Sequence, residues 1–310
     1  MKKIGVIILC VFLCNTVMYG QDVGSEYLKR AETSLNSGDC KEAKKWYLTY
    51  KNVTGKTDSN IENRIKKCEE GNDAVSQTKV QIDWVDIPAG TFTMGSPADE
   101  PERYSDEGQH QVSLSGFDMS KYAITFAQYD AFCEATGRAK PLDSGWGRGS
   151  RPVINVSWHD AVAFCNWVGG GCRLPTEAEW EYACRAGTTT PFYTGNNLST
   201  VQGNYNGSYP YNNNPNGEHR QKTLAVGSSS SNAWGLYDMH GNVDEWCSDW
   251  HGAYSGASQI DPKGPSSGDR KVLRGGNWGS RARFCRSAYR NLNSPSYSTN
   301  FVGFRVVFSK

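Results

Sequence analysis

Two groups of residues in this chain have the types and spacing that chemistry requires. In the first, Asp238 and Glu245 stand on either side of a tight Gly241-Asn242 turn, which is dense in oxygen atoms. Calcium takes about six to eight oxygen ligands and accepts carboxylates together with backbone carbonyls. The turn therefore predicts a calcium site. The alternative is that both carboxylates cap turns and pair with Arg173 or Arg274.

The second group centres on Cys285, the only thiol between Trp278 and Lys310. A thiolate is a nucleophile and a ligand for soft metal ions, so this residue could carry redox or metal chemistry. Three roles stay open: a buried small residue, a disulfide partner of Cys247, or a lone reactive thiol. The five histidines include no pair at helical ligand spacing, so we expect them at the surface or in turns.

The segment from Arg270 to Lys310 contains nine basic residues and no acidic one. Its mixture of Asn, Ser, Tyr, Arg and Trp is typical of adaptable binding surfaces. We expect a surface for a protein or peptide ligand made by Arg274, Trp278, Ser280, Arg281, Arg283, Asn291, Asn293 and Tyr297. The alternative is a solvated loop whose arginines pair with Asp244, Glu245 or Asp249.

Residues 21–79 are expected to form a helical segment that precedes these groups. Apolar residues recur at helical spacing on both sides of a Gly38-Asp39 break, which is similar to one tetratricopeptide-like hairpin with a third helix. Gly71–Lys79 is polar and is interpreted as a linker. The segment is either a spacer or a docking element for a partner in the cell envelope. Cys40–Cys68 is the disulfide that we expect first.

The rest of the chain predicts strands, three capped helices and long loops. Trp84–Ile87 and Thr91–Met94 flank Pro88-Ala89-Gly90, which predicts a hairpin. Helix starts are predicted where a capping residue is followed three positions later by Gln, Asp or Glu, at Thr125, Ser157 and Thr176. Beyond Gly187 the chain is rich in Gly, Asn and Ser but also in aromatics, which indicates packed loops rather than a disordered tail.

The first 20 residues have the pattern of a secretory signal: two lysines, an apolar run from Ile4 to Val17 and a small residue at Gly20. We therefore expect an exported protein, in the periplasm, at the outer membrane or secreted, with no transmembrane span in the mature chain. A lipid anchor on Cys14 is the alternative. Without Lys2 and Lys3, 31 basic residues face 32 acidic ones, so the net charge is −1 and does not point to nucleic acid.

Ordered motifs from about residue 82 onward resemble the sulfatase-modifying factor, or formylglycine-generating enzyme, family. They are Phe92-Thr93-Met94-Gly95, Pro152-Val153, Val156-Ser157-Trp158, Arg173-Leu174-Pro175-Thr176-Glu177-Ala178-Glu179-Trp180, Gly235-Leu236-Tyr237-Asp238-Met239, Gly241-Asn242-Val243, Glu245-Trp246, Arg274-Gly275-Gly276 and Gly303-Phe304-Arg305. The resemblance implies an α+β fold over residues 80–310, a loop-rich variant of the C-type lectin fold.

The resemblance also implies metal sites. One structural calcium would use Asp238, Glu245 and the carbonyls of Gly241 and Val243. A second would use Asn204, the Tyr205 carbonyl and, with a departure from the family's usual residue type, Glu218 and the Arg220 carbonyl.

The resemblance implies that catalytic members hold copper(I) between two cysteines. The copper activates dioxygen, which converts a cysteine of a client sulfatase to an aldehyde. Here Ser280 stands at the first cysteine position, and Cys285 has the spacing of the second, in a segment about three residues short. A serine hydroxyl does not replace a thiolate, so copper is not expected. The leading hypothesis is a calcium-stabilised, non-catalytic binding or assembly protein. The alternative is an oxidoreductase acting on protein cysteines or small sulfur compounds through Cys285.

Overall fold

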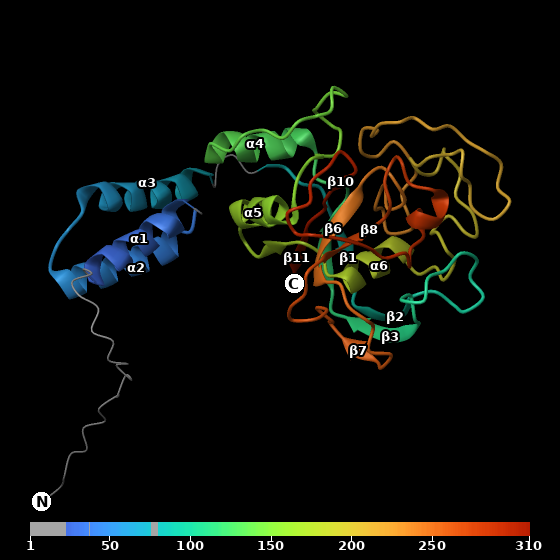
Figure 1. Cartoon of the computed structure of the whole chain (residues 1–310), viewed down its shortest axis with the longest axis horizontal. Helices are drawn as coiled ribbons and strands as arrows, with labels where there is room; N and C mark the ends of the chain where they lie inside the picture. The colour runs from blue at the N-terminus through green and yellow to red at the C-terminus, as the bar shows by residue number, and fades with distance from the viewer. Residues whose placement is uncertain (1–22, 37, 76–79) are drawn as a thin grey trace, which may run out of the picture. The chain divides into compact units, whose positions relative to one another are not determined.

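The computed structural model describes residues 23–36, 38–75 and 80–310, which divide into two compact units, one before and one after residue 79 (Figure 1). The predicted signal sequence and Cys14 lie outside the described residues. No helix within the described ranges combines the length and the apolar character that a membrane span requires.

The first unit consists of three helices, α1 (Val23–Asn36), α2 (Cys40–Thr54) and α3 (Ser59–Val75). Their shared core contains Ala31, Ala43, Tyr47, Tyr50, Ile61 and Ile65. The Asp39 carboxylate accepts a hydrogen bond from the Glu42 amide and starts α2. The predicted Cys40–Cys68 disulfide is present and joins α2 to α3. The linker prediction is wrong for residues 71–75, because α3 continues to Val75; a single glycine costs only about 1 kcal/mol and does not end a helix.

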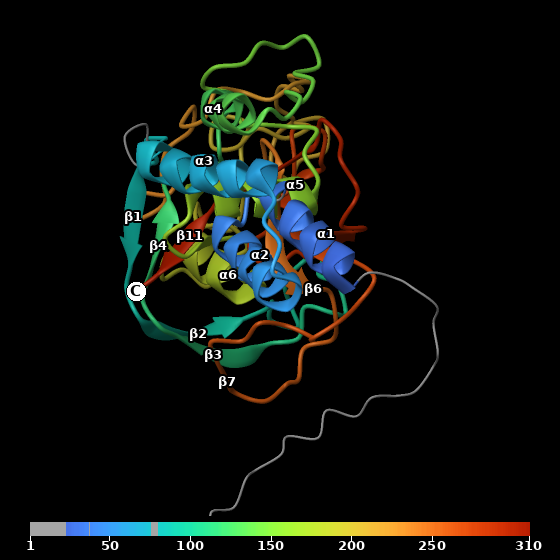
Figure 2. The same cartoon turned by 90° about the vertical axis from the view of Figure 1, so that its left-hand side faces the viewer.

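The second unit contains three small sheets. One has the order β1 (Trp84–Ile87), β4 (Phe117–Ser120), β11 (Val307–Ser309), β5 (Cys172–Arg173). Another has the order β10 (Val302–Gly303), β6 (Asp244–Trp250), β8 (Lys271–Arg274), β9 (Asn291–Asn293). The third has the order β2 (Gly90–Met94), β3 (His110–Leu114), β7 (Gln259–Ile260), and Figure 2 shows these three strands side by side.

The predicted hairpin between β1 and β2 is wrong, since the two strands belong to different sheets. β1 pairs with β4, where Ile87 faces Phe117, and β2 pairs with β3, where Gly90 faces Leu114. The chain also passes very close to helix α6 (Glu177–Arg185) at this point: a Cβ on Gly90 would lie 2.4 Å from the Tyr182 hydroxyl. The Pro88-Ala89 step is therefore a corner between sheets rather than a turn within one.

The three predicted capped helices are confirmed as α4 (Phe126–Thr136), α5 (Trp158–Val168) and α6 (Glu177–Arg185). Each begins with a reciprocal capping box, at Thr125, Ser157 and Thr176. Helix α6 contacts β2, β6 and β8, and all nine of its residues are buried, including four charged ones. Such a helix requires buried counter-charges, because charged side chains are rarely buried unless they are paired.

Between α6 and β6 the chain forms no regular helix or strand, only isolated bridges such as Asn204 with Gly241. It is nevertheless packed, as predicted, and appears as yellow and orange loops in Figure 1. Its fully buried side chains include Phe192, Leu198, Tyr205 and Tyr211. The buried side-chain amide of Asn242 stabilises the loop at Leu224. It accepts a hydrogen bond from the Leu224 amide at 2.8 Å and donates one to the Leu224 carbonyl at 3.2 Å. The described chain is thus a mixed α+β structure rich in ordered loops.

Candidate ligand-binding surface

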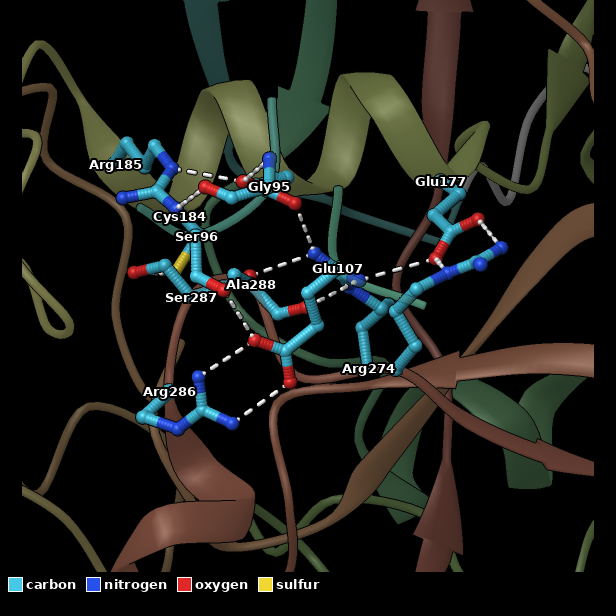
Figure 3. A network of polar contacts seen from close by, with 12 residues as sticks. Gly95, Ser96, Glu107, Glu177, Cys184, Arg185, Arg274, Arg286, Ser287 and Ala288 are labelled. Carbon is cyan, nitrogen blue, oxygen red and sulfur yellow. Dashed lines mark hydrogen bonds and ion pairs between the residues drawn. The ribbon is translucent and has the colours of Figure 1, made fainter. Parts of the chain in front are cut away.

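Arg274, predicted to lie on the ligand surface, is fully buried instead, and that prediction is wrong. Its guanidinium donates to Glu177 Oε1 at 3.0 Å and to Glu181 Oε2 at 2.5 Å, both from α6 (Figure 3). It also donates to the Ser287 carbonyl at 2.6 Å. Burial alone would raise the pKa of Glu177, but Arg290 and Arg274 outweigh it and hold this pKa below its usual value.

Other arginines of the C-terminal segment are buried in the same way. Arg286 binds both oxygens of Glu107 at 2.7 Å and also Glu100, and Figure 3 shows its guanidinium facing the Glu107 carboxylate. Arg290 binds both oxygens of Glu177, and Arg305 binds both oxygens of Glu245. We refer to Arg274, Arg286, Arg290 and Arg305 with their carboxylates as the buried arginine network. The basic character of the segment is therefore largely used to hold the core together.

Cys285 is a free, fully buried thiol rather than a disulfide partner of Cys247. It packs in a cluster with Phe192, Leu198, Tyr205, Tyr211 and Ala282, which contains no second cysteine among the described residues. Burial raises the pKa of the Cys285 thiol well above its usual value. Of the three roles left open by the sequence, the structure agrees with a buried small residue.

The Ser280 hydroxyl is also engaged, since it accepts a hydrogen bond from the Asn277 amide at 3.1 Å. With one buried thiol and one serine, the residues present do not fit a copper(I) site that requires two thiolates.

A cysteine, a serine and a histidine that sequence reasoning did not bring together do meet inside the protein. Cys184 Sγ lies 3.6 Å from Ser287 Oγ and 3.9 Å from His240 Nδ1. Figure 3 shows Cys184 and Ser287 next to each other. Burial raises the pKa of Cys184 to about 12 and lowers that of His240 to about 3. His240 Nδ1 lies 2.7 Å from the Cys285 carbonyl, and its Nε2 accepts from the Tyr193 amide. The group is structural. His240 is buried rather than at the surface, but it does stand at a bend, which was the other position expected for the histidines.

Trp278 stands in a half-buried cluster of rings from distant parts of the chain. Its indole stacks on Phe301 at 4.6 Å and meets Trp146 edge-on at 5.3 Å. The His219 ring lies 6.2 Å away at an angle of 21°. The indole Nε1–H donates to the Asn300 carbonyl at 2.9 Å, which fixes its orientation. We call these four residues the Trp278 cluster; Trp146, His219 and Phe301 were not predicted.

The remaining predicted ligand residues occupy the exposed side of the same segment. Arg281 is exposed, and Arg283, Asn291, Asn293 and Tyr297 are half-buried. The Asn291 amide donates to Asp244 Oδ2 at 3.3 Å, and Tyr297 packs against the core formed by α4 and α5. The structure therefore leaves Trp278, Arg281, Arg283, Asn293 and Tyr297 with side chains that a ligand can contact.

The first predicted calcium set does not fit a metal ion in this arrangement. Glu245 Oε1 accepts from Arg305 at 2.8 Å, and Oε2 accepts from Arg305 and from the Trp180 indole, both at 2.6 Å. Arg305 thus already neutralises the Glu245 carboxylate, in place of the expected partners Arg173 or Arg274. The Gly241 carbonyl accepts from the Val243 amide at 3.0 Å. Asp238 Oδ2 accepts from the Gly227 amide, and burial raises its pKa to about 6.

The second predicted set contains one group suited to a cation. Asn204 Oδ1 is buried and accepts no hydrogen bond within the described residues, so it is available to a metal ion. Its Nδ2 donates to the Lys222 carbonyl at 3.0 Å and to Asn242 Oδ1 at 3.1 Å. Tyr205 follows it with a fully buried ring. Glu218, however, is exposed and pairs with Arg220 at 3.1 Å, so it would have to turn to join such a site.

The loop-rich α+β unit with its terminal surface is found in one family of known proteins. Residues 71–310 match the family model described as sulfatase-modifying factor enzyme 1-like domain. The chain belongs to this family.

Three similar proteins illustrate its range. The formylglycine-generating enzyme of Thermomonospora curvata is 32% identical over 283 residues, covering 71% of this chain and 91% of that protein. The structure of PvdO from Pseudomonas aeruginosa is 33% identical, with a TM-score of 0.63, and covers 75% of this chain and 96% of that one. Treponema denticola variable protein 1 is 29% identical, with a TM-score of 0.62, and covers 73% of this chain and 95% of that one.

Proposed function

We propose that this protein is an exported, non-catalytic binding or assembly protein of the cell envelope. Its ligand, a protein or peptide, docks on the Trp278 cluster and the side chains around it. The observation that carries the proposal is the state of Cys285. The only thiol of the terminal segment is fully buried among rings, with its pKa raised, where neither a client nor a metal ion reaches a thiolate.

The Trp278 cluster supports the binding half of the proposal. Its rings are held in place before a ligand arrives, because Trp278 is stacked on Phe301 and hydrogen-bonded through its indole nitrogen. Rigid aromatic side chains lose little conformational entropy on binding and are frequent anchors of interfaces. Asn293 and Tyr297, from the same terminal segment, add adaptable polar contacts.

The experiment that tests the proposal compares three variants. Peptides selected from a random library on the wild-type protein should lose at least about tenfold in affinity for Trp278→Ala, since interface tryptophans are often worth 2 kcal/mol or more. Cys285→Ser should bind them unchanged. Trp278→Phe, which keeps a ring on Phe301, should retain part of the affinity. Equal affinities for all variants would exclude this surface.

The second candidate is an oxidoreductase of the formylglycine-generating type, which the 32% identity to the Thermomonospora curvata enzyme favours. It requires an accessible thiolate. Anaerobic titration with copper(I) against a competing chelator separates the two candidates. Binding of one copper per chain that disappears in Cys285→Ser would replace the binding proposal with catalysis.

Three further features belong to the same proposal. The helical unit is a tetratricopeptide-like docking element for an envelope partner, the loop-rich unit is a C-type-lectin variant, and residues 1–20 are a cleaved export signal. Amino-terminal sequencing of the mature protein tests the signal: a chain beginning after Gly20 supports it, and one that retains Met1 contradicts it.

We also propose that a structural calcium ion binds at Asn204, which its unpaired buried oxygen supports. Dialysis against a strong chelator should then lower the melting temperature, and added calcium should restore it in the wild type but not in Asn204→Ala. An unchanged melting temperature would remove calcium from the proposal.

A further inference from the structure

A pocket of about 240 Å³ opens beside the Trp278 cluster. It is lined by Glu102, Ser208, Tyr209, Pro210, Arg281 and Arg283. The backbone joins its walls, since the Ala282 amide donates to the Tyr209 carbonyl at 3.1 Å. Arg281, in the wall of the pocket, is three residues from Trp278, so the Cα atoms of these two residues are at most about 10 Å apart.

The charge of this pocket is not balanced. Of the nine basic residues between Arg270 and Lys310, six pair with carboxylates: Arg274, Arg283, Arg286, Arg290, Arg305 and Lys310. Lys271 is buried over the rings of Trp158 and Trp250. Arg281 pairs with no carboxylate among the described residues. Two guanidiniums therefore face the single carboxylate of Glu102, which leaves one positive charge in excess.

The two guanidiniums are also held in place. The Arg281 guanidinium lies 4.3 Å from the centre of the Tyr209 ring, which leaves the N–H groups at its edge free to donate. Arg283 lies 4.6 Å from the Phe284 ring and 3.3 Å from Glu102 Oε2. The Nε–H of Arg283 is buried and donates no hydrogen bond within the described residues. A concave wall with excess positive charge and fixed planar donors is suited to an oxyanion.

We propose that the Arg281–Arg283 pocket binds the oxyanion group of an acidic ligand: a carboxylate, or a sulfate or phosphate ester. This inference rests on the proposed function and narrows it, since the ligand that docks on the Trp278 cluster then carries an acidic group at its end or on a neighbouring side chain. The aromatic cluster supplies contact area, and the two arginines select for charge.

The test uses calorimetric titration of the full mature chain with N-acetylglutamate, sulfate and phosphate at constant ionic strength, balanced with chloride. We expect saturable binding of at least one of these anions, with a dissociation constant of about 1 mM. Arg281→Ala should weaken it about tenfold, the typical value of hydrogen bonds to a charged group. The anion bound most tightly identifies the source of the oxyanion: N-acetylglutamate indicates an acidic peptide, and sulfate or phosphate indicates an esterified ligand.

Two controls separate this pocket from general surface charge. Arg270→Ala also removes an exposed arginine that pairs with no carboxylate in the described part of the chain, but outside the pocket, and should leave the affinity unchanged. Arg281→Lys keeps the charge and loses the planar fork, and should give an intermediate affinity.

Equal weakening in Arg270→Ala and Arg281→Ala, or no saturable binding of any anion to the wild type, overturns the inference. The proposed function is tested separately, by the loss of affinity of Trp278→Ala for the peptides selected on the wild-type protein. Either result can fail while the other holds.

Discussion

Arginine has two different roles in two regions of the terminal segment. In the buried arginine network, Arg274 and Arg286 are fully buried, and each is bound to two carboxylates. In the pocket, Arg281 is exposed and pairs with no carboxylate among the residues that the structure describes, and Arg283 makes one long ion pair at 3.3 Å. The number of carboxylates around each arginine therefore decides its role. Arginines with enough internal carboxylates are buried in the core, and those with too few are available to a ligand.

The largest effect that follows from this comparison is on stability. Arg274→Ala leaves buried carboxylates with less compensation and should lower the free energy of unfolding by about 3–5 kcal/mol. Urea denaturation followed by tryptophan fluorescence measures it. The exposed Arg270→Ala is the control and should change the value by less than about 0.5 kcal/mol. Similar losses in both variants would mean that burial does not separate the two kinds of arginine.

A smaller effect is expected when the carboxylates are changed instead. Glu107→Gln removes the charge that Arg286 contacts twice, while Glu100 remains as its second partner. We expect a loss of about 1–3 kcal/mol in the free energy of unfolding.

Glu102→Gln, at the edge of the pocket, should change stability little and should strengthen anion binding, because it removes the one opposing charge. A loss of anion binding in Glu102→Gln would contradict this division.

The buried carboxyl groups determine whether stability rises or falls with pH. Burial, followed by repulsion from Glu177, raises the pKa of Asp249 to about 7, and burial raises that of Asp244 to about 6. Because the folded protein holds these protons more tightly than the unfolded chain, their contribution to stability grows as pH falls from about 8 towards 5 and is lost as pH rises through these values. Glu177 and Glu181 have lowered pKa values, so their contribution is lost in stronger acid.

The melting temperature should therefore pass through a maximum in mildly acidic solution. Asp249→Asn should flatten the rise between pH 8 and pH 5, whereas Asp99→Asn, at an exposed position, should leave it intact. A melting temperature that falls steadily from pH 8 to pH 5 in the wild type would contradict the assignment.

The smallest expected effect is that of salt. Raising sodium chloride from about 0.1 M to 1 M shortens the screening length from about 10 Å to 3 Å, which weakens interactions between solvent-exposed charges. Anion binding at Arg281 should weaken several-fold, while the difference in unfolding free energy between wild type and Arg274→Ala should stay nearly constant. If that difference collapses in high salt, water reaches the buried arginine network.

The sequence predicted the features whose interacting residues are close together in the chain, and it did not predict those whose interacting residues are far apart. The helices after Thr125, Ser157 and Thr176 were predictable because a capping box is complete within four residues. The fate of Arg274 was not, since Glu177 and Glu181 are more than 90 residues away. For the same reason the pairing of β2 with β3 replaced the expected hairpin, and Trp146 and His219 were not connected with Trp278. Local patterns specified elements, and long-range pairing decided which charges and rings remain at the surface.

The position of the last strands determines when the second unit can form. β10 joins the edge of one sheet beside β6, and β11 lies between β4 and β5 in another, with Val307 opposite both Met119 and Arg173. Neither sheet is complete without residues 302–309, so the second unit cannot close before strands that are far apart in the chain have paired.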